Sequence, residues 1–215
     1  MADRKARISV LAGANGAGKS SIAGATLRAR GAEYYNPDEA AREYRAVRPE
    51  STVEQANAAA WEIGREMLVR AIRGRLDFVF ETTLGGKSIT SLLEGAITAG
   101  LAVSIWYTGL ATVQLHMERV RARVREGGHD IPSAAIRRRY EQSPRNLIRL
   151  MPGLTSLYVY DNSTPADPAT GVAPIPFLVL HMEDGRIKGP EDLARTPDWA
   201  KSIVARALEL HQEPH

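Results

Sequence analysis

The chain has 215 residues, a net charge of +3 and no cysteine, with 44% hydrophobic and 25% charged residues. This composition is typical of a globular protein with a full core, and it excludes disulfides and chemistry at a cysteine thiolate. No stretch is apolar enough to span a membrane, and the start does not fit a signal peptide. We therefore expect a cytoplasmic protein with one domain over residues 1–215.

A glycine-rich loop follows the first apolar run. Residues 8–12 favour a buried parallel strand. The loop and the position after it read Gly13, Ala14, Asn15, Gly16, Ala17, Gly18, Lys19, Ser20 and Ser21, which contains the pattern G-x-x-x-x-G-K-S. The glycines permit backbone angles and close approaches that a Cβ would block, so backbone N–H groups can surround a polyphosphate. The sequence therefore predicts that these residues bind ATP.

Two side chains at the end of this loop have complementary roles. Lys19 supplies a cation for the β- and γ-phosphates, and the Ser20 hydroxyl suits Mg²⁺, which prefers oxygen ligands. A helix from about Lys19 to Arg28 would add its positive N-terminal end. Strand, glycine loop and helix together indicate a site for ATP with Mg²⁺.

A second strand over residues 32–36 leads into a helix that Asn36 can cap and Pro37 can begin. Asp38 then has two interpretations. It is favourable in the first turn of a helix, where it interacts with the helix dipole. It also follows the carboxyl end of a strand, where ligands bind in open α/β sheets, and there it could accept a proton from a substrate hydroxyl.

Residues 52–74 predict a long helix, because apolar residues recur at spacings of three and four. The expected buried stripe is Val53, Ala56, Ala60, Ile63, Met67 and Ala71. Trp61 lies off this stripe, so it either packs elsewhere or lines a pocket.

The next strand, residues 77–83, is apolar until it reaches Glu81, Thr82 and Thr83. A carboxylate there marks the emergence of the strand into solvent, or it binds a substrate hydroxyl or a metal-bound water. We favour a contact of Glu81 with a substrate hydroxyl or a metal-bound water, because the strand before the glycine loop should lie nearby. Thr82 and Thr83 are expected beside it in the substrate site. A helix over residues 88–99 and a fourth strand over residues 101–107 follow.

Residues 111–150 are strongly basic. They contain nine arginines and four acidic residues, a net charge of +5. Two helices, one over residues 111–125 and one from about Ser133, are joined by a turn with Gly127 and Gly128, and Pro144 should kink or end the second. Such a pair could close over phosphates as a lid, with one or two arginines acting, or it could be a solvated basic face.

The remaining chain completes the sheet. Residues 157–160 predict a fifth strand, residues 177–182 with a turn at Asp184-Gly185 predict a β-hairpin at the sheet edge, and a last helix reaches about residue 212. Strands alternate with helices, which indicates the α/β class. We expect a P-loop NTPase fold: a five-stranded, mainly parallel sheet flanked by helices, a helical arginine lid and a C-terminal hairpin extension.

Segments over most of the chain resemble, in the same order, the zeta-toxin family of P-loop kinases. They are Gly13–Ser20, Asn36–Asp38, Phe80–Thr83, Arg119–Val124 with Gly127–Pro132, Ile136–Tyr140 and Tyr160–Ser163. The resemblance implies phosphorylation of a hydroxyl on a UDP-amino sugar, typically UDP-N-acetylglucosamine. It implies Asp38 as general base, Glu81 as a substrate contact, and Arg123 with Arg138 or Arg139 on the transferred phosphate. It further suggests Asn162 at the nucleotide and a separate antitoxin as partner.

Three alternatives stay open: another small-molecule kinase on this scaffold, a non-kinase ATPase, and a P-loop protein that acts with nucleic acid. An ABC-type ATPase needs a signature such as Leu-Ser-Gly-Gly, which the chain lacks. Aromatic residues are only 6% and are not interleaved with the arginines, which disfavours stacking on bases.

Overall fold

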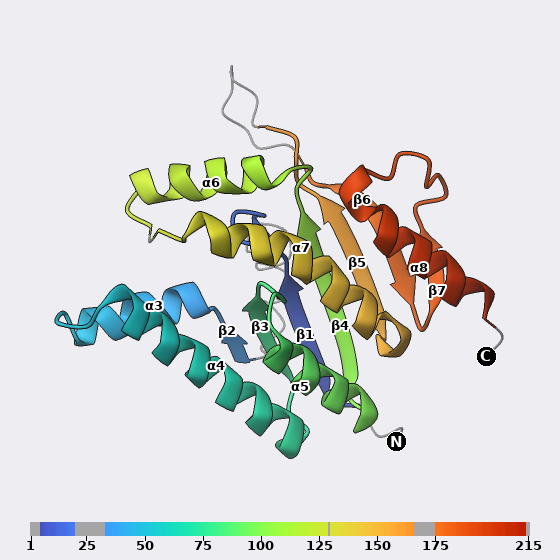
Figure 1. The fold of residues 1–215 in the computed structure, drawn as a ribbon. Coiled ribbons are helices and arrows are strands. Elements are labelled where there is room, and N and C mark those ends of the chain that lie inside the picture. Colours follow the sequence, from blue (N-terminus) through green and yellow to red (C-terminus); the bar gives the residue numbers. More distant parts are fainter. Residues whose placement is uncertain (1–4, 20–32, 129, 166–174, 214–215) are drawn as a thin grey trace.

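A computed structural model describes residues 5–19, 33–128, 130–165 and 175–213, and these form one α/β unit (Figure 1). Their strands make one seven-stranded sheet in the order β2-β3-β1-β4-β5-β6-β7. Its strands are β1 Arg7–Ala12, β2 Glu33–Tyr35, β3 Phe78–Thr82, β4 Ala102–Gly109, β5 Ser156–Asp161, β6 Phe177–Glu183 and β7 Arg186–Gly189. Strands β1 to β5 pair in parallel, whereas β6 pairs antiparallel with both β5 and β7. The expected class is confirmed, but the sheet has seven strands and not five, because the hairpin continues it.

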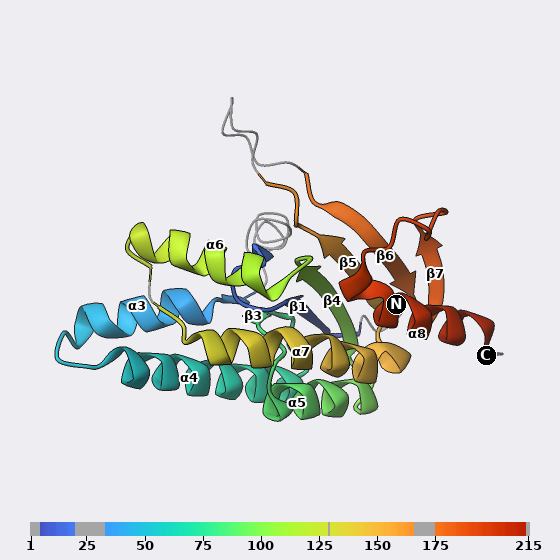
Figure 2. The same ribbon diagram turned by 45° about the horizontal axis from the view of Figure 1, so that its top comes forward.

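Helices cover one face of this sheet. The helices are α3 Pro37–Val47, α4 Val53–Gly74, α5 Lys87–Thr98, α6 Val113–Arg125, α7 Ser133–Leu150 and α8 Lys201–Gln212, with short 3₁₀ turns Met151–Gly153 (η1) and Asp198–Ala200 (η2). Figures 1 and 2 show α4, α5, α7 and α8 side by side as a layer over the sheet. In the described part of the chain, no helix combines the length and apolarity needed to cross a membrane.

The main core lies between that helical layer and the sheet. Side chains alternate along a strand, so Ile8 and Val10 of β1 face the helices, as do Ile105 of β4 and Leu157 of β5. All four are at most 1% exposed. Since the central strands are parallel and buried, their carboxyl ends meet at one edge of the sheet.

The stripe on α4 differs from the expected one. Ile63 is 44% exposed, and the buried positions are Ala56, Ala60, Gly64, Leu68 and Ala71. Gly64 lies against the ring of Tyr35, where an added Cβ would be 2.5 Å from Cε1. The Tyr35 hydroxyl also donates to the Ala60 carbonyl. Helix α4 therefore presents Gly64 to Tyr35 of β2, and Ile63 points outward.

Two local features place residues near the carboxyl edge. Asn36 caps α3 as expected, since its Oδ1 accepts from the backbone N–H of Asp38 at 2.9 Å and of Glu39 at 3.4 Å. Asp38 is thereby held in the first turn of the helix. Pro144 does not end α7, which continues to Leu150, and the two helices of the predicted lid, α6 and α7, pack together through Val120 and Ile136.

Candidate active site

The glycine loop after β1 has the backbone conformation that its sequence requires. Gly13, Gly16 and Gly18 have φ values of 139°, 81° and 85°, which side chains with a Cβ rarely adopt. Two of them also allow close approaches: a Cβ at Gly13 would lie 2.2 Å from the Thr108 carbonyl oxygen, and one at Gly18 would lie 2.5 Å from Asn162 Nδ2. Only glycine fits at these points.

Asn162, directly after β5, holds the loop from one side. Its Nδ2 donates to the Ala17 carbonyl at 2.9 Å, and its own carbonyl accepts from Arg119 Nη2 of α6 at 2.7 Å. The structure therefore brings Asn162 to the loop, 145 residues from Ala17 in sequence. Ser20, Ser21 and the helix expected after Lys19 lie outside the described residues.

Lys19 lies among charges from four elements. Burial lowers the pKa of its ammonium group; the carboxylates of Glu81 and Asp38 oppose this change, and the guanidinium groups of Arg123 and Arg139 add to it. The loop cation is thus close to the two carboxylates and to two lid arginines expected in the site.

The two candidate carboxylates have different surroundings. Asp38 Oδ2 forms a salt bridge with Arg123 Nη1 of α6 at 2.9 Å, and its side chain is 44% exposed. Glu81 at the end of β3 is only 7% exposed. Its Oε1 accepts from the Tyr34 hydroxyl and from Asn36 Nδ2, the latter at 3.5 Å. Asp38 is therefore accessible to a reactant, whereas Glu81 is fixed in place.

A cavity of about 460 Å³ opens between these carboxylates and the lid. We call it the Asp38 cavity. It is within the usual size for a small-molecule site. The residues expected in the substrate site, Asp38, Glu81, Thr82 and Thr83, all line it, as does Arg138. From α4 it receives Asn57, Trp61 and Arg65, and Trp61 is 46% exposed. Trp61 thus lines a pocket, the second of its two expected roles.

The two neighbouring lid arginines differ in position. Arg138 is exposed at the mouth of the Asp38 cavity. Arg139 is partly buried, and its Nη1 donates to Asn15 Oδ1 of the glycine loop at 2.6 Å. Both arginines line the Asp38 cavity, and Arg139 in addition joins α7 to the loop.

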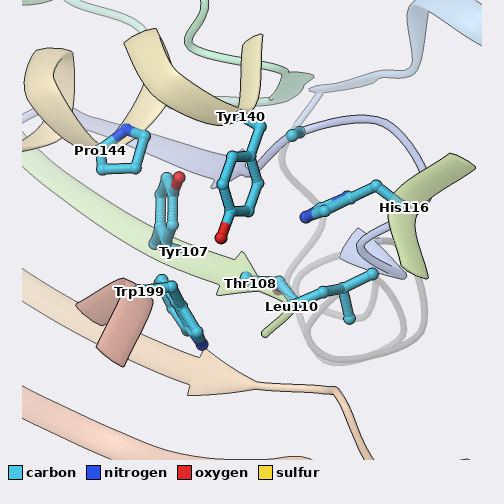
Figure 3. Close-up of a pocket in the computed structure, with 9 residues that line it drawn as sticks. Tyr107, Thr108, Leu110, His116, Tyr140, Pro144 and Trp199 are labelled. Carbon is cyan, nitrogen blue, oxygen red and sulfur yellow. The ribbon is translucent and has the colours of Figure 1, made fainter. Parts of the chain in front are cut away.

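A second, smaller cavity of about 90 Å³ lies behind the loop (Figure 3). Tyr107, His116, Tyr140 and Trp199 surround it. Trp199 packs against Gly109, where an added Cβ would lie 2.4 Å from Cη2 of the Trp199 ring. The Nε1 of Trp199 donates to Asp161 Oδ1 at 3.0 Å. Neither His116 nor Trp199 is part of a sequence motif, so sequence reasoning did not find them.

The chain is similar in sequence to known proteins. The family model of zeta toxin matches residues 2–163. An uncharacterized protein of Haemophilus influenzae (strain ATCC 51907 / DSM 11121 / KW20 / Rd) is 36% identical over 70 residues, which is 33% of this chain and half of that protein's length.

Solved structures share the fold. The crystal structure of AvrRxo1-ORF1:-ORF2 with ATP has a TM-score of 0.65 at 13% identity, covering 96% of this chain and 64% of that one. A structure of the PezAT chromosomal toxin-antitoxin system of Streptococcus pneumoniae has a TM-score of 0.54 at 14% identity, covering 99% of this chain and 89% of that one. The chain thus spans less than two thirds of the AvrRxo1-ORF1:-ORF2 chain. With the family model matching three quarters of its length, this chain belongs to the zeta toxin family, which supports an ATP-dependent, kinase-like function.

Proposed function

We propose that this protein transfers the γ-phosphoryl group of ATP to a hydroxyl of a UDP-amino sugar such as UDP-N-acetylglucosamine. One observation carries the proposal: the accessible carboxylate of Asp38 lies in a cavity that also holds the substrate-side residues and borders the glycine loop. Family membership supports the choice of acceptor.

The reaction follows from these positions. Asp38 accepts the proton of the acceptor hydroxyl, whose oxygen forms a bond to the γ-phosphorus as the bond from that phosphorus to the β,γ-bridging oxygen breaks and ADP leaves. Lys19, Arg123 and Arg138 offset the charge that spreads over the transferred group. Such transfer depends on alignment and cations more than on covalent help from the protein.

We also propose that Mg²⁺ accompanies ATP, held mostly by phosphate oxygens and water. The Ser20 hydroxyl would be its protein ligand. When bound, the ion would neutralise phosphate charge.

The Asp38 cavity has features that suit a sugar nucleotide. Trp61 offers an aromatic surface for a pyrimidine ring, Arg65, which is paired with Glu62, offers a cation for a diphosphate, and Thr83 offers a hydroxyl for a sugar. Glu81, fixed by Tyr34 and Asn36, is suited to accept from a sugar hydroxyl.

The test is direct. The purified protein is incubated with Mg²⁺, ATP and UDP-N-acetylglucosamine, and products are separated and identified by mass spectrometry. We expect ADP and a singly phosphorylated sugar nucleotide in equal amounts. UDP and free N-acetylglucosamine, supplied separately, serve as matched controls. ADP formation that is the same with and without the sugar nucleotide, and without a phosphorylated product, would contradict the proposal.

We also infer a separate antitoxin partner, which family membership and the likeness to the PezAT system support. The measurement is transfer activity of the protein isolated from its natural source, before and after bound proteins are removed under mild conditions. Activity should rise on removal; a protein isolated alone and fully active would contradict the inference.

A further inference from the structure

His116 of α6 is a buried histidine that the mechanism above does not use. It is 1% exposed, and its Nδ1 lies 2.7 Å from the carbonyl oxygen of Asn15 in the glycine loop. A carbonyl only accepts hydrogen bonds, so Nδ1 must carry the hydrogen. Burial lowers the pKa of His116 to about 4, so the ring is neutral at pH 7 and Nε2 carries no proton. The contact thus fixes one tautomer.

The packing around His116 leaves the ring little freedom. Tyr140 of α7 meets it edge to face, with the ring centroids 5.5 Å apart (Figure 3). The next loop residue also abuts α6, because a Cβ at Gly16 would lie 2.7 Å from the His116 carbonyl oxygen. Helix α6 therefore packs against the loop at Gly16, the residue after the one whose carbonyl accepts from the histidine.

The geometry of a peptide bond shows what this hydrogen bond controls. In a planar trans peptide, the carbonyl group and the following N–H point in opposite directions. His116 holds the Asn15 carbonyl on the side of α6, so the N–H of Gly16 must point away from α6. In a phosphate-binding loop, such N–H groups must converge on the ligand. Arg139 holds the side chain of the same Asn15 at 2.6 Å, so both lid helices fix this one residue.

We propose that His116 is a positioning residue that orients the Asn15–Gly16 peptide so that the loop is preorganised for nucleotide phosphates. The inference rests on the loop being the nucleotide site of the proposed function, but not on the identity of the acceptor. It assigns no contact between His116 and any reactant.

Three substitutions of His116 test whether the hydrogen-bond donor at Nδ1 is needed for nucleotide binding. His116→Asn keeps an amide donor near the place of Nδ1, His116→Gln moves the amide toward the place of Nε2, and His116→Phe keeps a ring without a donor. Binding of Mg²⁺-ADP is measured by calorimetry, without an acceptor. We expect affinity to fall about tenfold in the Phe and Gln variants, the usual scale for one lost hydrogen bond, and to change by about twofold or less in the Asn variant. The KM for ATP should follow the same order, with the KM for the acceptor unchanged.

A spectroscopic measurement on the unaltered protein removes any dependence on the folding of the variants. The ¹⁵N chemical shifts of the imidazole distinguish the two tautomers, and we expect the hydrogen on Nδ1 of His116. A hydrogen on Nε2, wild-type ADP affinity in the Phe variant, or an Asn variant as weak as the Phe variant would each overturn the proposal. Because neither the calorimetry nor the spectroscopy uses an acceptor, failure of the sugar-nucleotide proposal would leave these two results unaffected.

Discussion

The glycine loop and the Asp38 cavity lie at the same edge of the sheet but are built in different ways. The loop is fixed mainly through its backbone: Asn162 and His116 bind its carbonyls, and Gly13 and Gly18 allow contacts that no Cβ would permit. The cavity is formed mainly by side chains, and Trp61 and Asp38 are nearly half exposed. A site built from backbone recognises a group common to all nucleotides, whereas a site built from side chains can differ from one acceptor to another. Substitutions should therefore separate nucleotide binding from acceptor choice.

The largest effect is expected at Lys19, where the two regions meet. Lys19→Ala removes the cation at the end of the loop, and transfer should fall by about 10³-fold, the scale of a lost electrostatic contact to a transition state. The measurement is the rate of product formation from ATP and UDP-N-acetylglucosamine. Lys188→Ala, at an exposed lysine on β7, is the matched control. Unchanged turnover in Lys19→Ala would place the chemistry elsewhere.

The lid should show an uneven response, because only some of its arginines reach the site. Arg123 contacts Asp38, whereas Arg125, two residues later on α6, is exposed. Arg123→Ala should slow transfer by about 10²-fold or more, and Arg125→Ala by less than about twofold. Equal and small effects of both, together with nucleic-acid binding that weakens steeply with salt, would favour a basic surface over a lid.

The burial of His116 predicts a pH dependence of stability. Its pKa is about 4 in the folded protein and about 6.5 in the unfolded chain, so between these values the unfolded chain binds more protons and stability falls as pH falls. From pH 7 to pH 4.5 the free energy of unfolding should drop by about 2–3 kcal/mol through this residue. Urea unfolding at both pH values measures this. The free energy of unfolding of His116→Asn should drop less than that of the wild-type protein, and the difference should equal the contribution of His116. An equal drop in both proteins would mean that His116 titrates normally.

The smallest effect is expected at Trp61, where a substitution should change only the KM for the acceptor. Trp61→Ala should raise the KM for the acceptor about tenfold, the scale of a lost stacking contact with a base, and leave the KM for ATP unchanged. Leu208→Ala, at a similarly exposed apolar residue on α8, is the control. A rise in the KM for ATP alone would show that Trp61 does not face the acceptor.

Local signals in the sequence predicted much of this arrangement. The glycine loop, the strands around it and the cap at Asn36 depend on neighbouring residues, so periodicity and residue type were enough. The orientation of α4 was not predictable in this way, because Gly64 rather than Ile63 is buried in order to accept the ring of Tyr35. The course of α7 past Pro144 likewise departs from the local propensity of proline.

Contacts between distant segments account for the rest. Arg123 meets Asp38 across 85 residues, and His116 meets Asn15 across 101. Residue type suggested that one or two arginines of the lid would act on phosphate, and the family resemblance singled out Arg123. No comparable signal marked His116, since a single histidine in a basic helix has no motif and its partner is a backbone carbonyl.

The most direct test of the separation between the two regions is Asp38→Asn. This change keeps the size of the side chain and removes the proposed general base. Mg²⁺-ATP affinity should stay within about twofold of wild type, while transfer to UDP-N-acetylglucosamine should fall by about 10²-fold or more. Glu39→Gln, which removes a carboxylate from the same helical turn outside the cavity, should change neither quantity. A loss of ATP affinity in Asp38→Asn, with transfer per bound ATP unchanged, would contradict the account and leave Asp38 as a residue of the helix start alone.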